Sequence, residues 1–166
     1  MELASAHALG IADVAISAVS ASERQKGDRF LDSYGEFRGL LERLELGHLS
    51  EVQGISYVGI SYWDHALHPD HEMLARERSI HQAMFPTVPF IWGDFAASRG
   101  IDKEAIKDQR AKRWRRSFCD RQMFWAHDHA SPDIFVTRDK HYAALVGHRD
   151  FPQARICSPM EAARSL

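Results

Sequence analysis

The chain has 166 residues, 45% of them hydrophobic and 27% charged, which suits one globular domain with a sizeable core. Its 21 Lys and Arg against 23 Asp and Glu give a formal charge of −2, so any attraction to nucleic acid must come from a local basic patch. Cys119 and Cys157 lie far apart without a CxxC pattern, which argues against a disulfide scaffold and a zinc knuckle. No apolar run could span a bilayer, and the N-terminus lacks the features of a signal peptide. We therefore expect no membrane partner and a location in the reducing cytoplasm.

Helices and strands alternate in the first half of the chain. Residues 1–9 predict a short helix that ends at Gly10, and the β-branched run at 13–19 predicts a buried strand. Residues 22–46 carry Phe and Leu at helical spacing with charges between them, so they predict a helix. Residues 54–63 alternate and are rich in aromatic side chains, as in a strand.

The second half continues this alternation and ends in two short strands. Helices are expected at 70–85, 101–118 and 120–130, the last with Asp120 at its N-cap, and 87–95 is expected to be a loop or a short extended piece. Apolar runs predict strands at 133–137 and 154–159. The whole pattern indicates one α/β domain over residues 1–166, with a mostly parallel central sheet covered on both faces.

Three carboxylates follow predicted strands or open predicted helices on one rim of this sheet. They are Glu23, Asp120 and Asp139, and Asp64 is a weaker fourth. Each alone could be a helix cap or favour a helix dipole. Together they predict a divalent-metal site, because crowded carboxylates repel one another unless a cation joins them. Mg²⁺ and Mn²⁺ prefer oxygen ligands, and either can activate water and neutralise charge on a phosphoryl group.

Several motifs in the chain resemble the PIN-domain family of metal-dependent ribonucleases. The stretch "DRQMFWAHDHASPDIFVTRDKHY" has the family's order of an acid opening a helix, a turn, and a strand ending in V-T before x-D. The stretch "ARICSP" resembles the family's short final strand, and "AISAVSASERQ" resembles its second strand with a helix-opening Glu. Residues 47–118 are poorly matched and are expected to be a subfamily insert.

The resemblance implies a three-layer PIN-like fold and hydrolysis of RNA by a metal-activated water. Carried over onto this sequence, Glu23, Asp120 and Asp139 would be the catalytic, metal-holding acids, and Thr137 would support the site through its hydroxyl. Asp128 and Asp133 are weaker matches. The cofactor would be Mg²⁺ or Mn²⁺, and the family's toxin members imply an antitoxin partner and a homodimer.

The N-terminal part departs from the family. PIN domains begin with a hydrophobic strand that ends in a metal-site aspartate, whereas this chain starts with what resembles the following helix. Asp13 is no substitute, because it precedes its strand. We therefore expect an N-terminally truncated PIN-like domain with an incomplete site. The alternatives are a catalytically inactive module that binds RNA or a protein, and a truncated product without activity.

Residues 107–118 form a strongly basic stretch just before Asp120. Arg113, Arg115 and Arg116 would contact RNA phosphates, and Trp114 would stack on an unpaired base. The alternative is a solvated helix face with screened charges.

Two histidine-rich stretches invite other metal sites. His65, His68 and His71 surround Pro69, which breaks any regular face and favours a surface loop. "AHDH" at 126–129 suggests an HD-type phosphohydrolase, but that fold is entirely helical and the strands after it argue against it. One of its two histidines should pack inside and the other lie exposed.

Overall fold

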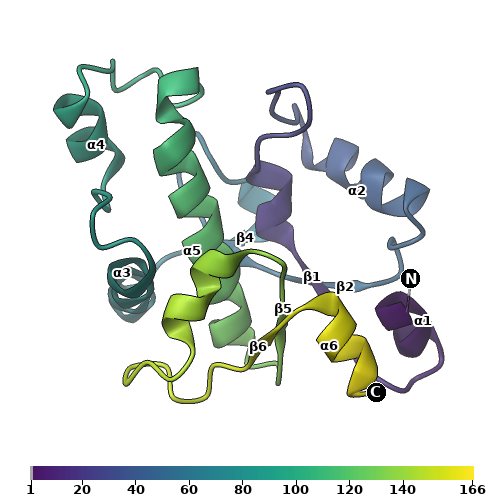
Figure 1. The fold of residues 1–166 in the computed structure, drawn as a ribbon. Coiled ribbons are helices and arrows are strands. Elements are labelled where there is room, and N and C mark those ends of the chain that lie inside the picture. Colours follow the sequence, from purple (N-terminus) through teal and green to yellow (C-terminus); the bar gives the residue numbers. More distant parts are fainter. Residues whose placement is uncertain (1) are drawn as a thin grey trace.

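The computed structural model describes residues 2–166 and combines helices with short parallel strands (Figure 1). The strands form three pairs: β1 (Ala15–Ser17) with β2 (Ser50–Val52), β3 (Gly54–Ile55) with β4 (Ala66–Leu67), and β5 (Phe135–Val136) with β6 (Ile156–Cys157). Every pair is parallel, so the general α/β class is confirmed. Within the described residues the pairs remain three separate two-stranded sheets, where one continuous central sheet was expected.

Among the described residues, six α-helices and four short 3₁₀ helices surround these pairs. The α-helices are α1 (Glu2–Ala8), α2 (Tyr34–Arg43), α3 (His71–Met84), α4 (Trp92–Ser98), α5 (Lys112–Ala130) and α6 (Pro159–Arg164). The 3₁₀ helices are η1 (Ala18–Ser22), η2 (Trp63–His65), η3 (Gln109–Ala111) and η4 (Lys140–Leu145). The predicted helices at 1–9 and 70–85 are confirmed by α1 and α3, and the two last strands lie inside their predicted ranges.

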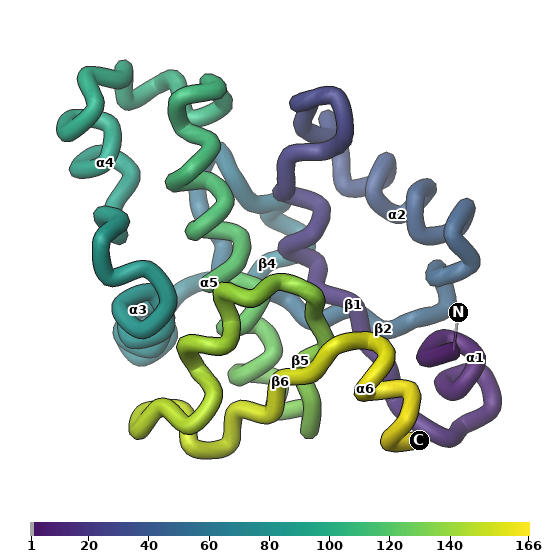
Figure 2. Tube along the Cα trace, in the orientation of Figure 1, coloured from purple at the N-terminus to yellow at the C-terminus, as the bar shows by residue number. Residues whose placement is uncertain are grey.

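Helix α5 is the central element of the fold. Its 19 residues contain neither Gly nor Pro, and it ends where Ser131 takes a left-handed conformation (φ 56°) before Pro132. The helix runs between α3 and α4 on one side and β1 and α2 on the other (Figure 2), and it packs against α3, η1 and β3. It therefore connects the side of the molecule that contains α3 and α4 to the side that contains β1 and α2.

The apolar core divides into three clusters, two of which α5 joins. Phe124 and Trp125 from α5 pack with α3 and η4 residues, whereas Trp114 and Phe118 pack with α4. A third cluster around Phe37 buries the inner face of α2. The expectation that Phe124 and Trp125 belong to the core is confirmed, since each is 1% exposed.

A buried ion pair links α3 to α5 inside this core. The Arg121 Nε donates to the Glu77 carboxylate at 2.6 Å, and both side chains are essentially unexposed. Glu77 also accepts from the Tyr57 hydroxyl, and the Arg121 guanidinium lies 4.3 Å from the centroid of the Phe90 ring. Charges out of water are stable only when they are paired in this way, so this network fixes how the two helices dock.

Several expected elements differ from the observed ones. The predicted buried strand at 13–19 is reduced to Ala15–Ser17, none of which is buried, because η1 begins directly after it. In the predicted helix at 22–46, only α2 forms, capped by Ser33, because Gly27 and Asp28 adopt positive φ angles that interrupt any helix. The predicted strand at 54–63 is reduced to Gly54–Ile55 by a turn in which the Ile60 amide donates to the Tyr57 carbonyl.

The other two differences concern the segment before α5. Helix α4 begins at Trp92, inside the expected loop, because tertiary contacts fix this residue: its indole donates to the Lys103 carbonyl and packs against Trp114. The basic helix expected at 101–118 begins only at Lys112, and it continues through Asp120 without a break.

Candidate metal centre

Asp120 lies in the middle of α5 and not at a helix N-cap, so that prediction is wrong. The helix begins eight residues earlier at Lys112, and nothing in its sequence ends it before Ser131. Asp120 is 5% exposed. Its backbone carbonyl accepts a hydrogen bond from the Tyr142 hydroxyl at 3.0 Å, which ties η4 to this turn of α5.

Asp139 follows β5, as the sequence predicts, and opens η4. Its side chain accepts from the His141 amide at 2.9 Å, the hydrogen bond of an N-cap. The Thr137 hydroxyl in turn accepts from the Asp139 amide at 3.1 Å. Thr137 thus holds the backbone of Asp139 in position, and its hydroxyl has the supporting place that the sequence suggested.

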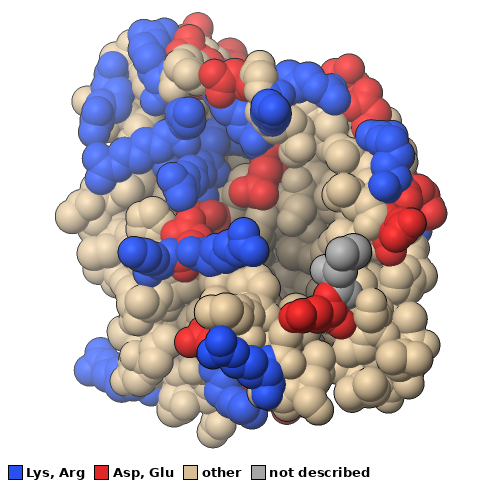
Figure 3. All heavy atoms as spheres, turned by 45° about the vertical axis from the view of Figure 1, so that its right-hand side comes forward, with Lys and Arg blue, Asp and Glu red and all other residues tan. Residues whose placement is uncertain are grey.

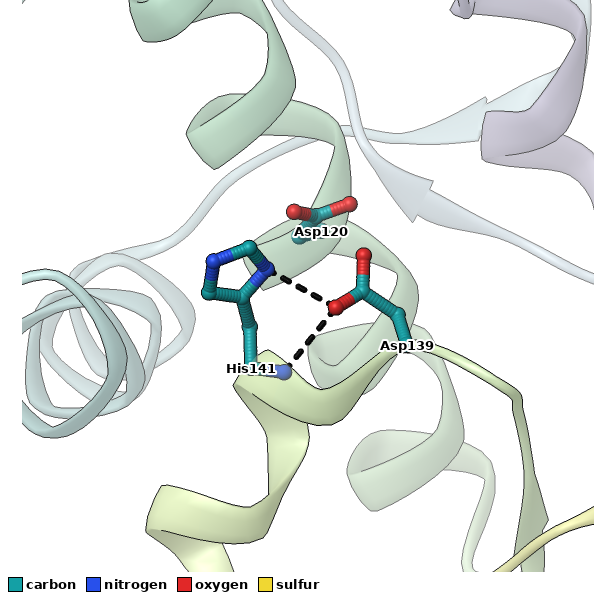
Figure 4. A group of neighbouring side chains, drawn as sticks. All are labelled: Asp120, Asp139 and His141. Atoms are coloured by element: carbon teal, nitrogen blue, oxygen red, sulfur yellow. Dashed lines mark hydrogen bonds and ion pairs between the residues drawn. The ribbon is translucent and has the colours of Figure 1, made fainter.

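Asp120, Asp139 and His141 converge on one point, where each offers a ligand atom within 4.8 Å of the others (Figure 4). The His141 Nδ1 lies 2.8 Å from a carboxylate oxygen of Asp139. His141 was not among the predicted site residues. The signal that could have found it is its position two residues after Asp139, where a capped 3₁₀ turn brings both side chains to one side.

The Asp120 carboxylate has the properties expected of an unsatisfied cation ligand. Its Oδ2 is buried and has no hydrogen-bond partner among the described residues. Burial, with the nearby charges of Asp139 and Glu23, raises the pKa of Asp120 to about 7. Ionising a buried carboxyl group is costly unless enough positive charge lies beside it, and the Arg116 guanidinium at 3.9 Å does not bring the pKa back to its usual range, so the donor set at this point fits a divalent cation.

Glu23 lies beside this group, although it does not open a helix. It follows η1 in an extended conformation, and with Asp120 and Asp139 it lines a cavity of about 560 Å³. Burial raises the pKa of Glu23, the positive charge of Arg116 opposes this, and Asp139 adds to it. All three acids selected from the sequence line this cavity, whereas the group whose ligand atoms lie within 4.8 Å of one another consists of Asp120, Asp139 and His141.

Arg116 bridges the carboxylates. Its guanidinium donates to Asp139 at 2.8 Å and lies 3.9 Å from Asp120. The hydrogen bond to Asp139 raises the pKa of Arg116. The pKa of Asp139 is lowered overall: its partial burial acts in the opposite direction, but the hydrogen bonds from the His141 amide and Arg116 outweigh it.

Of the other residues predicted to bind RNA in the basic stretch, one lies on the surface and the others lie in the core. Arg113 is exposed and donates to the Thr87 hydroxyl at 3.4 Å. Trp114 is 2% exposed, donates to the Pro89 carbonyl and stacks on Phe118, so it offers no surface for a base. Sequence periodicity could not show this, because the burial comes from α4 and the chain before it.

Arg115 is also buried, against the expectation of a free phosphate contact. It donates to the Ser22 carbonyl and lies over the Phe30 ring, and burial lowers its pKa. Its Nε and Nη1 have no hydrogen-bond partner among residues 2–166. Arg115 also lines the 560 Å³ cavity beside Lys112 and Arg116.

The weaker acidic and histidine candidates lie outside this group. Asp64 belongs to η2, and Asp128 is paired with Arg76 at 2.7 Å. His127 is buried and His129 stacks on Trp125, so one histidine packs inside and the other lies exposed, as expected.

Basic side chains dominate the surface near the start of α5. Figure 3 shows Lys and Arg gathered over the upper left of one face, in the part of the molecule where Figure 1 places α4 and the first turns of α5. Acidic side chains border this patch. Lys112, Arg115 and Arg116 line the same cavity as the carboxylates, so the site combines acidic and basic side chains.

Neither the family models, nor the curated proteins, nor the solved structures compared with this chain give a significant match. In the part of the chain that the structure describes, none of the helices has the length and apolarity that a membrane crossing requires.

Proposed function

We propose that the protein is a metal-dependent hydrolase of RNA phosphodiesters. The single observation that carries this proposal is the buried Asp120 Oδ2, which accepts no hydrogen bond from any described residue and lies beside two further carboxylates. Perturbed pKa values and unsatisfied polar groups in a cavity are typical of functional sites.

Asp120, Asp139 and Glu23 would hold Mg²⁺ or Mn²⁺, with His141 as a nitrogen ligand. When bound, such a cation supplies an activated water and neutralises charge that develops on a phosphoryl group. Imidazole nitrogen suits transition ions better than Mg²⁺, so the presence of His141 in the group favours Mn²⁺.

The basic residues around the carboxylates would bind and orient the substrate. Arg116 reaches both Asp139 and the cavity, and a guanidinium can donate two parallel hydrogen bonds to a phosphate. Lys112 lines the same cavity one helical turn away. A phosphodiester placed there would have positive charge on one side and the carboxylates on the other.

The PIN-like fold belongs to this proposal. The parallel strand pairs and an acid directly after β5 support it. The toxin-type role, an antitoxin partner and a homodimer follow from the resemblance alone.

The test is cleavage of a fluorescently labelled single-stranded RNA with Mn²⁺, with Mg²⁺ and with EDTA. Asp139→Asn should abolish cleavage. Asp133→Asn is the matched control, because Asp133 is exposed and precedes β5 at its other end. Cleavage that survives EDTA or Asp139→Asn would refute the proposal.

One observation favours a second function, a module that binds RNA without cutting it. The Arg116–Asp139 pair already neutralises part of the carboxylate cluster, as a structural ion pair would. In that case RNA affinity would be the same with Mn²⁺ and with EDTA, no cleavage would appear, and Arg116→Met would weaken binding.

A further inference from the structure

A second cavity, of about 570 Å³, adjoins the carboxylate group on the other side of Arg116. Its apolar wall comes from the end of α3 and the turn that follows, with Met84, Phe85 and Val88. Met84 and Val88 are buried, whereas Phe85 is partly exposed. The wall is therefore a fixed part of the core surface with one aromatic ring accessible from the cavity.

The opposite wall of this cavity is basic. It is formed by η3 and the first turns of α5, with Arg110, Lys112, Arg113 and Arg116. Lys112, Arg113 and Arg116 are exposed. A cavity with one apolar wall and one cationic wall matches a ligand that is itself apolar on one side and anionic on the other.

The cavity is also directly connected to the carboxylate group. Asp120 and Arg116 line both cavities, and His141 lies between the acids and the apolar wall. The His141 ring is 2.8 Å from Asp139 through its Nδ1, and its centroid is 5.8 Å from that of Phe85. A ligand group in contact with Phe85 would thus be separated from the proposed reaction site by the His141 ring.

We propose that this cavity binds an unpaired nucleobase of the RNA, next to the linkage that is cleaved. The base would lie against Phe85, and its flanking phosphates would contact Arg113 and Lys112. This inference rests on the proposed function and adds a subsite to it, which holds a base turned out of the helical stack. A base inside a duplex cannot reach such a cavity, and sequence-tolerant stacking on aromatic rings is the usual way that proteins hold unpaired bases.

The test compares two labelled ligands of equal charge in EDTA, where no metal-dependent cleavage can occur. One is decauridylate, and the other is an abasic ribose-phosphate decamer. Fluorescence anisotropy should show that the wild-type chain binds decauridylate at least tenfold more tightly, because stacking of one base contributes about that much. A uridine–adenosine duplex of the same length should bind at least tenfold more weakly than decauridylate.

Two variants separate the base from the phosphates. Phe85→Leu should reduce the preference for decauridylate to below threefold, and Arg113→Met should weaken both decamers by a similar factor. Arg164→Met is the control, because Arg164 is exposed on α6 and lines neither cavity. If Phe85→Leu lowers the melting temperature, the wild-type comparison of the two decamers tests the base site by itself, and Thr87→Glu, beside Arg113 at the exposed rim, should weaken both decamers through the phosphate contacts.

Equal affinity of the wild-type chain for the two decamers, or equally tight binding of an oligoglutamate of the same charge, would overturn the base site. Unchanged binding of both decamers in Arg113→Met and in Thr87→Glu would overturn the phosphate contacts. The proposed function has a separate readout, since Mn²⁺-dependent cleavage is measured with the same RNA. Cleavage without base preference would refute only the base site, and base preference without cleavage would refute only the hydrolase.

Discussion

The Arg116 guanidinium lies 2.8 Å from the Asp139 carboxylate and 3.9 Å from that of Asp120, and so stands where a metal ion would have to compete with it. Apart from these two contacts, the Arg116 side chain on α5 is exposed to solvent. An arginine so placed lowers the repulsion within the acid cluster. The relationship makes Arg116 the residue through which metal and RNA binding would influence each other.

Replacement of Arg116 by Met should therefore strengthen Mn²⁺ binding while it weakens RNA binding. At pH 8, where the carboxylates are ionised, loss of the competing charge should raise the Mn²⁺ affinity about three- to tenfold, since a charge pair near the surface contributes on the order of 1 kcal/mol. Titration calorimetry measures this, with Arg149→Met as the control at an exposed position. An unchanged or weaker Mn²⁺ affinity would show that Arg116 does not occupy the site.

Asp120→Asn should stabilise the metal-free protein at neutral pH. The pKa of Asp120 is raised to about 7 by burial and by Asp139, whereas it is near 3.8 in the unfolded chain. Between these values the folded state holds a proton that the unfolded state has released, so the stability contributed by this group falls as pH rises from about 4 to 7. Relative to the wild type, the free energy of unfolding of the variant should be unchanged at pH 4 and higher by roughly 2–4 kcal/mol at pH 8.

Urea unfolding in EDTA at several pH values tests this difference. The comparison cancels groups far from Asp120, whereas the charged side chains of Glu23, Asp139, Arg116 and His141 face it and are part of the measured effect. A difference in unfolding free energy that does not change with pH would contradict the raised pKa of Asp120.

Trp114→Phe should destabilise the fold without changing RNA affinity. The variant loses the indole hydrogen bond to the Pro89 carbonyl and part of a packed ring, which costs about 1–3 kcal/mol. RNA affinity should stay within twofold of the wild type. A tenfold loss in a variant that is still folded would mean that Trp114 reaches the RNA after all.

Glu77→Gln should be among the most destabilising single changes in the chain. It leaves the Arg121 guanidinium buried without its counter-ion, and such a change typically costs about 3–5 kcal/mol. Glu72→Gln, at an exposed position on the same helix, is the control and should change stability by less than about 0.5 kcal/mol. Chemical denaturation of both variants distinguishes a buried ion pair from an exposed one.

The parts of the fold that the sequence predicts are those with local signals. Helix α3 begins after the N-cap Asp70 and ends before Pro86, and both residues mark its ends in the sequence. The apolar run before Thr137 similarly places β5 and the acid that follows it. Asp139 was found in this way.

The other parts of the fold and of the site depend on contacts between segments that are distant in the sequence. Asp120 looks like a helix cap in sequence, and only the absence of Gly or Pro over 112–130 argues for one uninterrupted helix. Burial of Trp114 and of the Glu77–Arg121 pair comes from α3 and α4 packing on α5, and charged residues normally predict exposure. The place of His141 depends on a 3₁₀ turn, which has no periodic sequence signal.

The most direct test of the metal centre is Mn²⁺ titration calorimetry at pH 8 on the wild-type chain, the Asp120→Asn/Asp139→Asn double variant and the control Asp133→Asn. We predict binding at one class of site in the wild type and the control, and none in the double variant. A folded wild-type chain that does not bind Mn²⁺, or a double variant that binds it equally well, would contradict the assignment of the metal to these carboxylates.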